Sequence, residues 1–397
     1  MAIVKLIDIC EKIGSGATPR GGKEAYCDEG ISLVRSQNVL DFSFSREGLA
    51  FINDGQAKKL NNVEVLSGDV LLNITGDSVA RACIMSDEYL PARVNQHVAI
   101  VRGKTDRVLN NYLLYFLQWR KGHLLQLASA GATRNALTKG MIEQLELDLP
   151  SFDDQKKIVA ILDSLQGKIQ LNQKINDNLY AQARAITNQW IVEKKDDYNL
   201  LPLSEIATIN PDTYSPKEEW EYVNYLDTSN ITDGCIADIQ HIIPASEKLP
   251  SRARRIIAPN DVVFSTVRPN QRHFGIISEP LPNMLASTGF AVIRSKNPLV
   301  CNELIYLCVT ENAFIEKMQQ LAEQSTSTFP SIKPSDLGVC EIPCPKDGLS
   351  GNLTETLRAM FALVAANHRE NTSLAELRDS LLPKLMTGEI DVSDIQI

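Results

Sequence analysis

The chain repeats mostly apolar residues at alternating steps of three and four along two stretches, which is the a/d pattern of a coiled coil. The first stretch places them at Leu162, Leu165, Ile169, Asn172, Asn176, Leu179, Ala183, Ile186 and Trp190. The second, about 195 residues later, places them at Leu357, Met360, Val364, Asn367, Asn371, Leu374, Arg378, Leu381 and Leu385. The pattern predicts a helix from about 154 to about 192 and a second helix that Pro383 interrupts, because proline lacks the amide that continues a helix.

Two consecutive polar layers fall at matching places in the two patterns. They are Asn172 and Asn176 in the first, and Asn367 and Asn371 in the second. Buried asparagine costs stability but fixes register, so we expect the two helices to pair with each other. An antiparallel return needs no long crossover, and it would set Asn172 opposite Asn371 and Asn176 opposite Asn367. A parallel pair would match the asparagines equally well, so they fix register and not direction.

Shorter motifs ahead of each helix are also repeated, at offsets of 191 to 195 residues. The corresponding segments are 67–72 and 259–264, 98–102 and 290–294, 111–115 and 302–306, and 147–150 and 342–345. They predict one duplicated mixed α/β unit, in which turns lead into short buried strands. Arg102 and Arg294 end strands at equivalent places in the two copies.

Together the repeats predict an α+β fold, with two mixed α/β units separated by two long antiparallel helices under pseudo-two-fold symmetry. Ser151 and Asp154 read as a capping box before the first helix, and Asn352 and Glu355 as its counterpart before the second. The predicted parts are unit one at 1–151, helix and spacer at 152–197, unit two at 198–345, and C-terminal helix and spacer at 346–397.

Composition is that of a globular protein: 397 residues, 44% hydrophobic and 22% charged, with a net charge of −9. This charge argues against a protein that simply coats nucleic acid, so any nucleic-acid surface must be local. One candidate is 252–272, with five arginines against Asp261 alone. Without a long apolar run or a signal-peptide pattern, we expect a cytoplasmic protein with no membrane partner. The eight cysteines lack zinc-site spacing and are expected to be reduced, mostly buried thiols.

No catalytic or cofactor-binding motif is complete. Asn210–Tyr214 has the wrong third residue for the Asn/Asp-Pro-Pro-aromatic strip of an adenine methyltransferase. The segment 16–23 fails as a phosphate loop, because Ala17 stands at the first glycine position and Glu24 replaces the hydroxyl that would hold magnesium. The five histidines show no ligand spacing. We therefore expect no enzyme activity, no cofactor and no metal in this chain.

Four segments resemble the specificity subunit of type I restriction–modification systems. They are Ser15-Gly-Ala-Thr-Pro19, Val34-Arg-Ser-Gln-Asn-Val39, Asp154-Gln-Lys-Lys-Ile158, and Leu377-Arg-Asp-Ser-Leu-Leu-Pro-Lys-Leu385 with Gly388. The resemblance covers essentially the whole chain. It implies two target-recognition domains, each reading half of a split, asymmetric DNA sequence. It also implies that the paired helices set the gap between the halves and dock two methyltransferase subunits, and that two motor-nuclease subunits complete the restriction complex.

The second copy departs from this pattern at two places. Asn352–Thr356 replaces the Asp154–Lys156 opening, and Asn210–Tyr214 stands where the first copy has Gly-Ala-Thr-Pro. These departures fit divergence between two DNA-reading domains, and they weaken any residue-by-residue transfer between them.

The predicted DNA contacts are basic and amide side chains in loops, because Arg and Lys bind guanine or phosphate and Asn and Gln can bind adenine. In the first unit they are Arg20, Lys23, Arg35, Ser36, Gln37, Asn38, Arg81, Arg93, Asn95, Gln96 and Arg134. In the second they are Arg252, Arg254, Arg255, Arg268, Asn270, Gln271, Arg272, Ser287, Thr288 and Lys333. For each residue the competing interpretation is a solvated loop. Because Arg102 and Arg294 are equivalent in two units that would read different sequences, we expect a structural or phosphate-positioning role for them and not a choice of base.

We therefore expect a non-catalytic reader of double-stranded DNA that also scaffolds its partner subunits. Two alternatives stay open. One is an enzyme with an unrecognised active site, which activity of the purified chain alone would support. The other is a protein-interaction scaffold, from which DNA binding that falls steeply with salt would distinguish a reader.

Overall fold

The computed structural model describes residues 2–19, 25–129, 135–215, 217–325, 329–346 and 353–395. The chain forms two compact units. Unit 1 consists of Met1–Gln170 and Asn371–Ile397, and unit 2 of Leu171–Glu370. Each unit therefore includes one half of each long helix, so the helices belong to the cores of both units.

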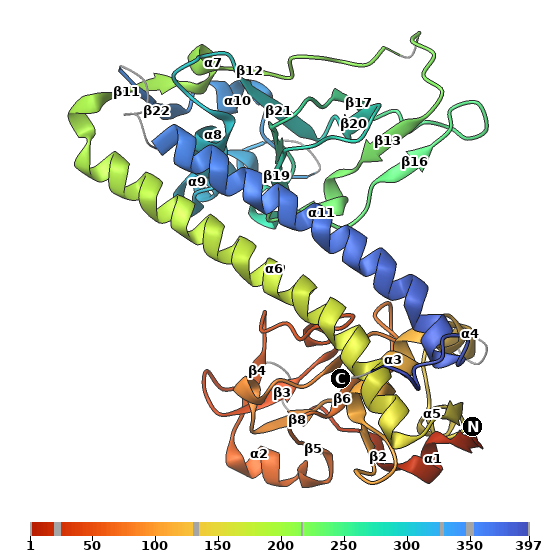
Figure 1. The fold of residues 1–397 in the computed structure, drawn as a ribbon. Coiled ribbons are helices and arrows are strands. Elements are labelled where there is room, and N and C mark those ends of the chain that lie inside the picture. Colours follow the sequence, from red (N-terminus) through yellow and green to blue (C-terminus); the bar gives the residue numbers. More distant parts are fainter. Residues whose placement is uncertain are drawn as a thin grey trace. The chain divides into compact units, whose positions relative to one another are not determined.

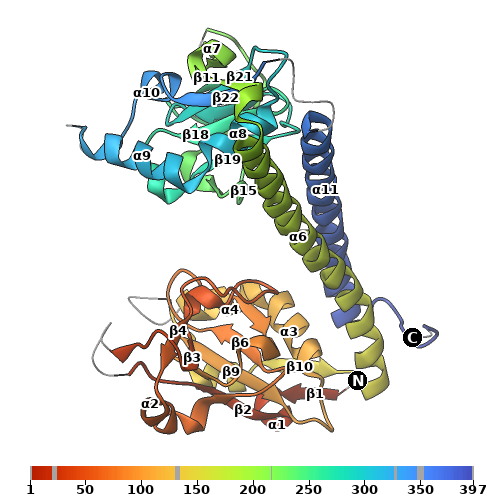
Figure 2. The same ribbon diagram turned by 90° about the vertical axis from the view of Figure 1, so that its left-hand side faces the viewer.

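Unit 1 has two four-stranded sheets and a two-stranded ribbon (Figure 2). The first sheet has the order β2 (Cys10–Ser15), β9 (Val98–Gly103), β6 (Val70–Asn73), β7 (Ala82–Ile84). The second has the order β4 (Ala50–Ile52), β3 (Ile31–Val34), β8 (Ala92–Val94), β5 (Glu64–Val65), in which β3 and β8 run parallel. The ribbon pairs β1 (Ala2–Lys5) with β10 (Glu146–Leu149). The short helices are α1 (Leu6–Ile9), α2 (Asp54–Lys58), α3 (Asn110–Trp119), α4 (Lys121–Ser129) and α5 (Lys139–Glu143).

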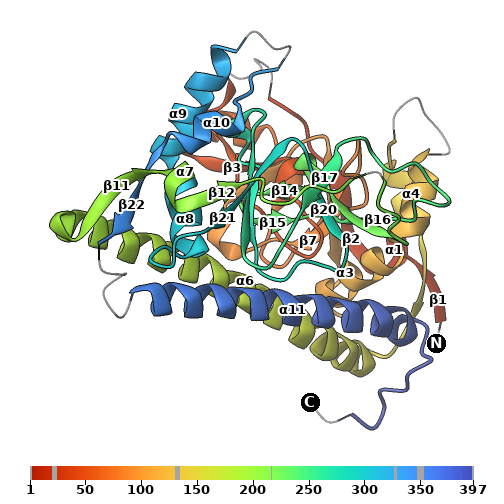
Figure 3. The same cartoon turned by 90° about the horizontal axis from the view of Figure 1, so that it is seen from above.

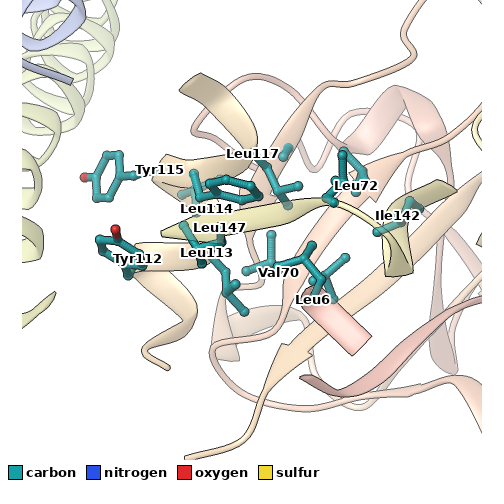
Figure 4. Close-up of a cluster of buried hydrophobic side chains, with 14 of the residues drawn as sticks. Leu6, Val70, Leu72, Tyr112, Leu113, Leu114, Tyr115, Leu117, Ile142 and Leu147 are labelled. Atoms are coloured by element: carbon teal, nitrogen blue, oxygen red, sulfur yellow. The ribbon is translucent and has the colours of Figure 1, made fainter. Parts of the chain in front are cut away.

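The alternation of side chains along β6 explains why this strand is apolar throughout. Val70 and Leu72 point into a cluster with α3, α1 and β10, as Figure 4 shows. Leu71, on the opposite face, packs into the cluster formed with the second sheet. The first sheet is thus buried on both faces, which gives a near-continuous apolar run in the sequence.

Unit 2 repeats this architecture, which confirms the predicted duplication. Its first sheet has the order β12 (Ala207–Ile209), β21 (Phe290–Ser295), β18 (Asp261–Ser265), β19 (Phe274–Ile277). Its second has the order β16 (Gln240–Ile242), β13 (Val223–Leu226), β20 (Met284–Ser287), β17 (Ala253–Ile256), again with one parallel pair, β13 and β20. The other elements are β11 (Tyr198–Pro202), β14 (Ile231–Thr232), β15 (Cys235–Ile236), β22 (Glu341–Pro345), α7 (Leu203–Ile206), α8 (Asn302–Val309), α9 (Asn312–Glu323) and α10 (Pro334–Gly338). As α3 does in unit 1, α8 covers the first sheet (Figure 3).

The same ion pair lies at the same place in both units. Arg102 Nε is 2.6 Å from Asp69 Oδ1, and Arg294 Nε is 2.7 Å from Asp261 Oδ1. Both aspartates are fully buried, and each also accepts a hydrogen bond from the backbone of the preceding turn. The hydrogen bonds that Arg294 donates to the Asp261 carboxylate raise the pKa of the Arg294 guanidinium. Of the two roles open for Arg102 and Arg294, the structure therefore shows the structural one.

Two long helices, α6 (Phe152–Glu193) and α11 (Leu353–Met386), pack side by side (Figures 1 and 3). At the start of α6, Asp154 N donates to Ser151 Oγ at 3.2 Å, as the capping box predicts, whereas Asn352 lies outside the described residues. Within unit 2, Asn367 Nδ2 donates to Asn176 Oδ1 at 2.7 Å, which confirms the predicted antiparallel register at this layer.

The other polar layers differ from simple asparagine pairs. In unit 2, Asn172 Nδ2 donates to Glu370 Oε2 at 2.7 Å. Asn371 belongs to unit 1, so its predicted pairing with Asn172 joins different units and stays a prediction. Within unit 1, Arg378 Nη1 donates to Gln166 Oε1 at 2.6 Å and its guanidinium lies 4.1 Å from the Phe42 ring centroid.

The predicted interruption at Pro383 is wrong, because α11 continues through this residue to Met386. Leu382, Leu385 and Met386 are buried in the core of unit 1. Their burial offsets the lost backbone hydrogen bond of proline, so tertiary packing overrides the local signal here.

Candidate nucleic-acid interface

In unit 1, several loops meet at one edge of the fold. Because β3 and β8 run parallel, the segments that leave them, 35–38 and 95–97, emerge at the same edge. Backbone hydrogen bonds join the loop after β6, residues 74–80, to 95–97 and to 135–137. A backbone hydrogen bond from Gly16 adds segment 16–18 to this group. We call these five segments the loop edge of unit 1.

A chain of hydrogen bonds fixes the loop edge of unit 1. Thr18 N donates to Gln96 Oε1 at 2.9 Å, and Gln96 Nε2 lies 3.2 Å from His97 Nε2. His97 Nδ1 in turn lies 2.6 Å from Thr75 Oγ1. A Cβ atom on Gly16 would lie 1.8 Å from a backbone carbonyl oxygen of β8, so only glycine permits this approach. The Gly-Ala-Thr-Pro element therefore supports the exposed Gln96.

The corresponding loops meet in unit 2. The parallel pair β13 and β20 brings 227–230 and 287–289 to one edge. Backbone hydrogen bonds join the loop 266–272 to 287–289 and to 329–333, and Thr288 N donates to Arg252 O at 2.8 Å. These segments, with Arg252, form the loop edge of unit 2.

The two loop edges share their backbone frame. Ile74 N donates to His97 O at 2.9 Å, and Thr266 N donates to Gly289 O at 2.8 Å at the equivalent place. Likewise Leu137 N donates to Ile74 O at 2.8 Å, and Ile332 N to Thr266 O at 2.9 Å. One frame thus presents two different sets of side chains.

The predicted contacts in unit 1 fall into three groups. Arg20, Lys23 and Arg134 lie outside the described residues. Asn38, Arg93 and Asn95 are buried, and their side chains hold backbone groups or neighbouring side chains of the same unit. The side chains that reach the surface are the exposed Gln37 and Gln96 and the half-buried Arg35, Ser36 and Arg81.

Two of the surface residues in unit 1 are already engaged. Arg35 Nη2 donates to Gly48 O, and its guanidinium lies 5.6 Å from the Tyr26 ring centroid. Gln37 Nε2 donates to the backbone carbonyl oxygen of Gly48 at 3.2 Å. Gln96 is exposed but also engaged, by Thr18 N and His97, so Ser36 and Arg81 are the surface candidates in unit 1 whose side chains form no hydrogen bond with another described residue.

In unit 2 the five arginines of the stretch 252–272 are divided between side chains that hold the fold and one that is exposed. Arg272 Nε lies 2.6 Å from Asp233 Oδ1, and the Arg268 guanidinium lies 4.8 Å from the Phe329 ring centroid. Arg254 Nε donates to Ser251 O at 3.2 Å, and Arg255 Nη1 to Thr213 Oγ1 at 3.4 Å. Burial lowers the pKa of the Arg255 guanidinium. Ser287 is fully buried, so the exposed candidates are Arg252, Asn270, Gln271, Thr288 and Lys333.

The sequence did not reveal that acidic residues elsewhere in the chain form ion pairs with Arg272 and with Arg294. Asp212, inside the Asn210–Tyr214 segment, lies 2.7 Å from Arg294 Nη1. Asn210 Oδ1 in the same segment accepts a hydrogen bond from Val292 N at 3.0 Å. The segment that resembles a methyltransferase strip therefore serves to anchor a sheet strand.

The described residues also bear on metal binding and on membrane insertion. No group of three or more His, Cys, Asp or Glu side chains in that part of the chain is arranged to hold a metal ion. No helix within the same residues is long and apolar enough to cross a bilayer.

Comparison with known proteins gives one consistent family. The family model of the type I restriction modification DNA specificity domain matches residues 1–181. The specificity subunit of the type I restriction enzyme HindI from Haemophilus influenzae is 22% identical, over 91% of this chain and 94% of the relative. The specificity subunit of the enzyme MjaIX from Methanocaldococcus jannaschii is 21% identical, over 99% and 94%.

A solved structure shares the fold. The S subunit of a type-I restriction-modification system from M. genitalium matches with a TM-score of 0.53 and 14% identity, over 97% of this chain and 96% of that one. The family model over residues 1–181, the relatives over nearly the full length and the duplicated architecture agree, and the chain is similar to the specificity subunits of type I restriction–modification systems.

Proposed function

We propose that this chain is the non-catalytic DNA-reading subunit of a type I restriction–modification complex, in which each unit reads one half of a bipartite, asymmetric site. The observation that carries this proposal is the shared frame of the two loop edges, which presents different side chains. Gln96 in unit 1 corresponds to Thr288 in unit 2, and both are exposed. Equivalent frames with different surface chemistry suit two related but distinct DNA sequences.

The distribution of exposed charge in unit 2 supports a local DNA-binding surface on a protein that is acidic as a whole. The net charge is −9, yet the loop edge of unit 2 has the exposed cations Arg252 and Lys333. In unit 2 the buried Asp261 and the half-buried Asp227 are held by side chains of the same unit. The phosphate backbone would meet the free cations, while exposed amides and hydroxyls nearby would meet base edges.

The long helices would set the distance between the two half-sites. At about 1.5 Å per residue, the 42 residues of α6 would span about 63 Å. The polar layer of Asn176 and Asn367 opposes sliding of one helix along the other, so the span would be defined. Their outward faces, which include the exposed Lys168, Gln173 and Lys174, would dock two methyltransferase subunits, to which two motor-nuclease subunits would be added.

Mapping of methylated adenines in the host genome tests this function. Cells with the gene are expected to show methylation in one split, non-palindromic sequence, and cells without the gene to lose it. Methylation that is unaffected by the deletion would contradict the proposal. If the methylated sequence were palindromic, its two halves would be the same, which would contradict the proposal that the two units read different half-sites.

A protein-interaction scaffold is the second candidate, since long paired helices can also join proteins alone. Binding of the purified chain to duplex DNA at several salt concentrations separates the two functions. A reader loses affinity steeply with salt, with a slope of about −0.9 per neutralised phosphate. A scaffold would show no such binding.

A further inference from the structure

A five-residue loop begins and ends with a left-handed residue at the same place in both units. In unit 1 it is 76–80, with φ of 75° at Gly76 and 68° at Ala80. In unit 2 it is 268–272, with φ of 48° at Arg268 and 58° at Arg272. Residues with a Cβ atom rarely adopt this conformation, so surrounding contacts must hold the loop in unit 2.

Contacts of both arginines hold the ends of the loop in unit 2. Arg272 Nε lies 2.6 Å from Asp233 Oδ1, and its Nη1 donates to Asn312 Oδ1 on α9 at 3.0 Å. Arg268 N donates to the backbone carbonyl oxygen of Pro330 at 2.9 Å, and its guanidinium lies over the Phe329 ring. These side chains therefore position the loop, although the sequence predicted them as DNA contacts.

The tip between these ends presents two amide side chains. Pro269 is buried, whereas Asn270 and Gln271 are exposed. Asn270 N donates to Gln319 Oε1 on α9 at 3.2 Å, which fixes the backbone of the tip. Neither amide side chain forms a hydrogen bond with another described residue, so both remain available to a ligand.

The chemistry of the tip matches one base. Asn or Gln can donate to N7 and accept from N6 of adenine in the major groove at the same time. A tip whose backbone is already fixed loses less conformational entropy on binding than a free loop does. In unit 1 the equivalents of Asn270 and Gln271 are the half-buried Ser78 and the buried Val79, which cannot form this pair of hydrogen bonds.

We propose that Asn270 and Gln271 determine specificity for one A·T base pair in the half-site of unit 2, with Arg268 and Arg272 as positioning residues. The inference rests on the proposed function of unit 2 as a DNA reader. Beyond that function, it names the two residues that select a base and the base that they select. It also states that unit 1 lacks this contact.

The experiment selects bound DNA from a randomised duplex library with the full-length chain in complex with its methyltransferase subunits. The test variant is Asn270→Ser with Gln271→Val, which copies the side chains of unit 1 onto the same backbone. Gln240→Ala is the control, because Gln240 is an exposed amide on β16, outside the loop edge. Gln271→Ala alone provides a milder change, and thermal unfolding shows that each variant folds.

We expect the double variant to lose a preference for adenine of about tenfold or more at one position of one half-site. The other half-site and the control should keep their sequence. A bipartite sequence that the double variant and Gln271→Ala leave unchanged would overturn this inference and leave the proposed function intact. Failure of the unmodified complex to select any sequence would overturn both.

Discussion

Asn367 and Asn176 form a hydrogen bond of 2.7 Å between the two long helices, and both side chains are more than nine-tenths buried. A polar pair inside an apolar seam stabilises only the register in which the two amides meet. Any slide of one helix along the other would bury two unpaired amides, which costs more than the pair contributes. This layer therefore defines how the halves of α6 and α11 fit together in unit 2.

Replacing one member of this pair should destabilise the protein. Asn367→Ala leaves the Asn176 amide buried without its donor, and we expect a loss of about 1–3 kcal/mol in the free energy of unfolding. Urea denaturation measures it, with Asn188→Ala at an exposed position of α6 as the control. If both alanine variants unfolded at the same urea concentration, the buried pair would have no special role.

The ion pair of Arg102 and Asp69 should be structural. Asp69→Asn keeps the acceptor for the backbone amide of Leu66 but removes the charge that faces Arg102. We expect a loss of about 1.5–3 kcal/mol in unfolding free energy, because hydrogen bonds to charged groups are worth about this much. Glu11→Gln is the matched control, since Glu11 lies 3.7 Å from Arg102 and is exposed. Equal effects of the two changes in urea denaturation would count against a buried structural pair.

Periodicity predicted the helices and the duplication, because both depend on which face of each element is apolar. The register at Asn176 also followed from the sequence. The continuation of α11 through Pro383 did not, because it depends on the burial of Leu385 and Met386 in the core of unit 1. Local signals of this kind yield to tertiary packing that a sequence pattern does not display.

The exposed Arg252 should contribute one phosphate contact. Arg252→Ala is expected to lower the salt slope of DNA binding by about one, because one fewer counterion is released on binding. Arg254→Ala should change the slope less, since Arg254 is half-buried and bonded to Ser251 O. Binding titrations at several salt concentrations check both values, and Lys346→Ala on the segment after β22 is the control. A slope that Arg252→Ala leaves unchanged removes this residue from the interface.

Thiol reactivity should separate Cys235 from the buried cysteines. Burial raises the pKa of Cys10, Cys83 and Cys301 to about 12, so these thiols stay protonated and unreactive in the folded protein at pH 8. Cys235 is exposed and should react first with a disulfide reagent. Cys235→Ser should remove the fastest phase of labelling, and persistence of that phase would show that another thiol is accessible.

The candidate interface was harder to predict than the fold. The sequence indicated the arginine-rich stretch 252–272, but Arg272 in this stretch pairs with Asp233, 39 residues away. Outside it, Arg294 pairs with Asp261 and also with Asp212, which is 82 residues away. A contact between residues so distant in the chain depends on sheet order. Asn38 and Ser287 look like readers in the sequence but are buried, because side-chain exposure in a loop depends on the turn that the backbone adopts.

An exchange of residues 198–345 for the equivalent segment of a relative tests the central claim most directly. The methylated sequence of the chimera would be mapped in cells that contain the same methyltransferase subunits. If each unit reads its own half-site, one half of the recognised sequence changes, and the other half and the spacing between them stay the same. A change in both halves, or in neither, would contradict the account of two independent readers.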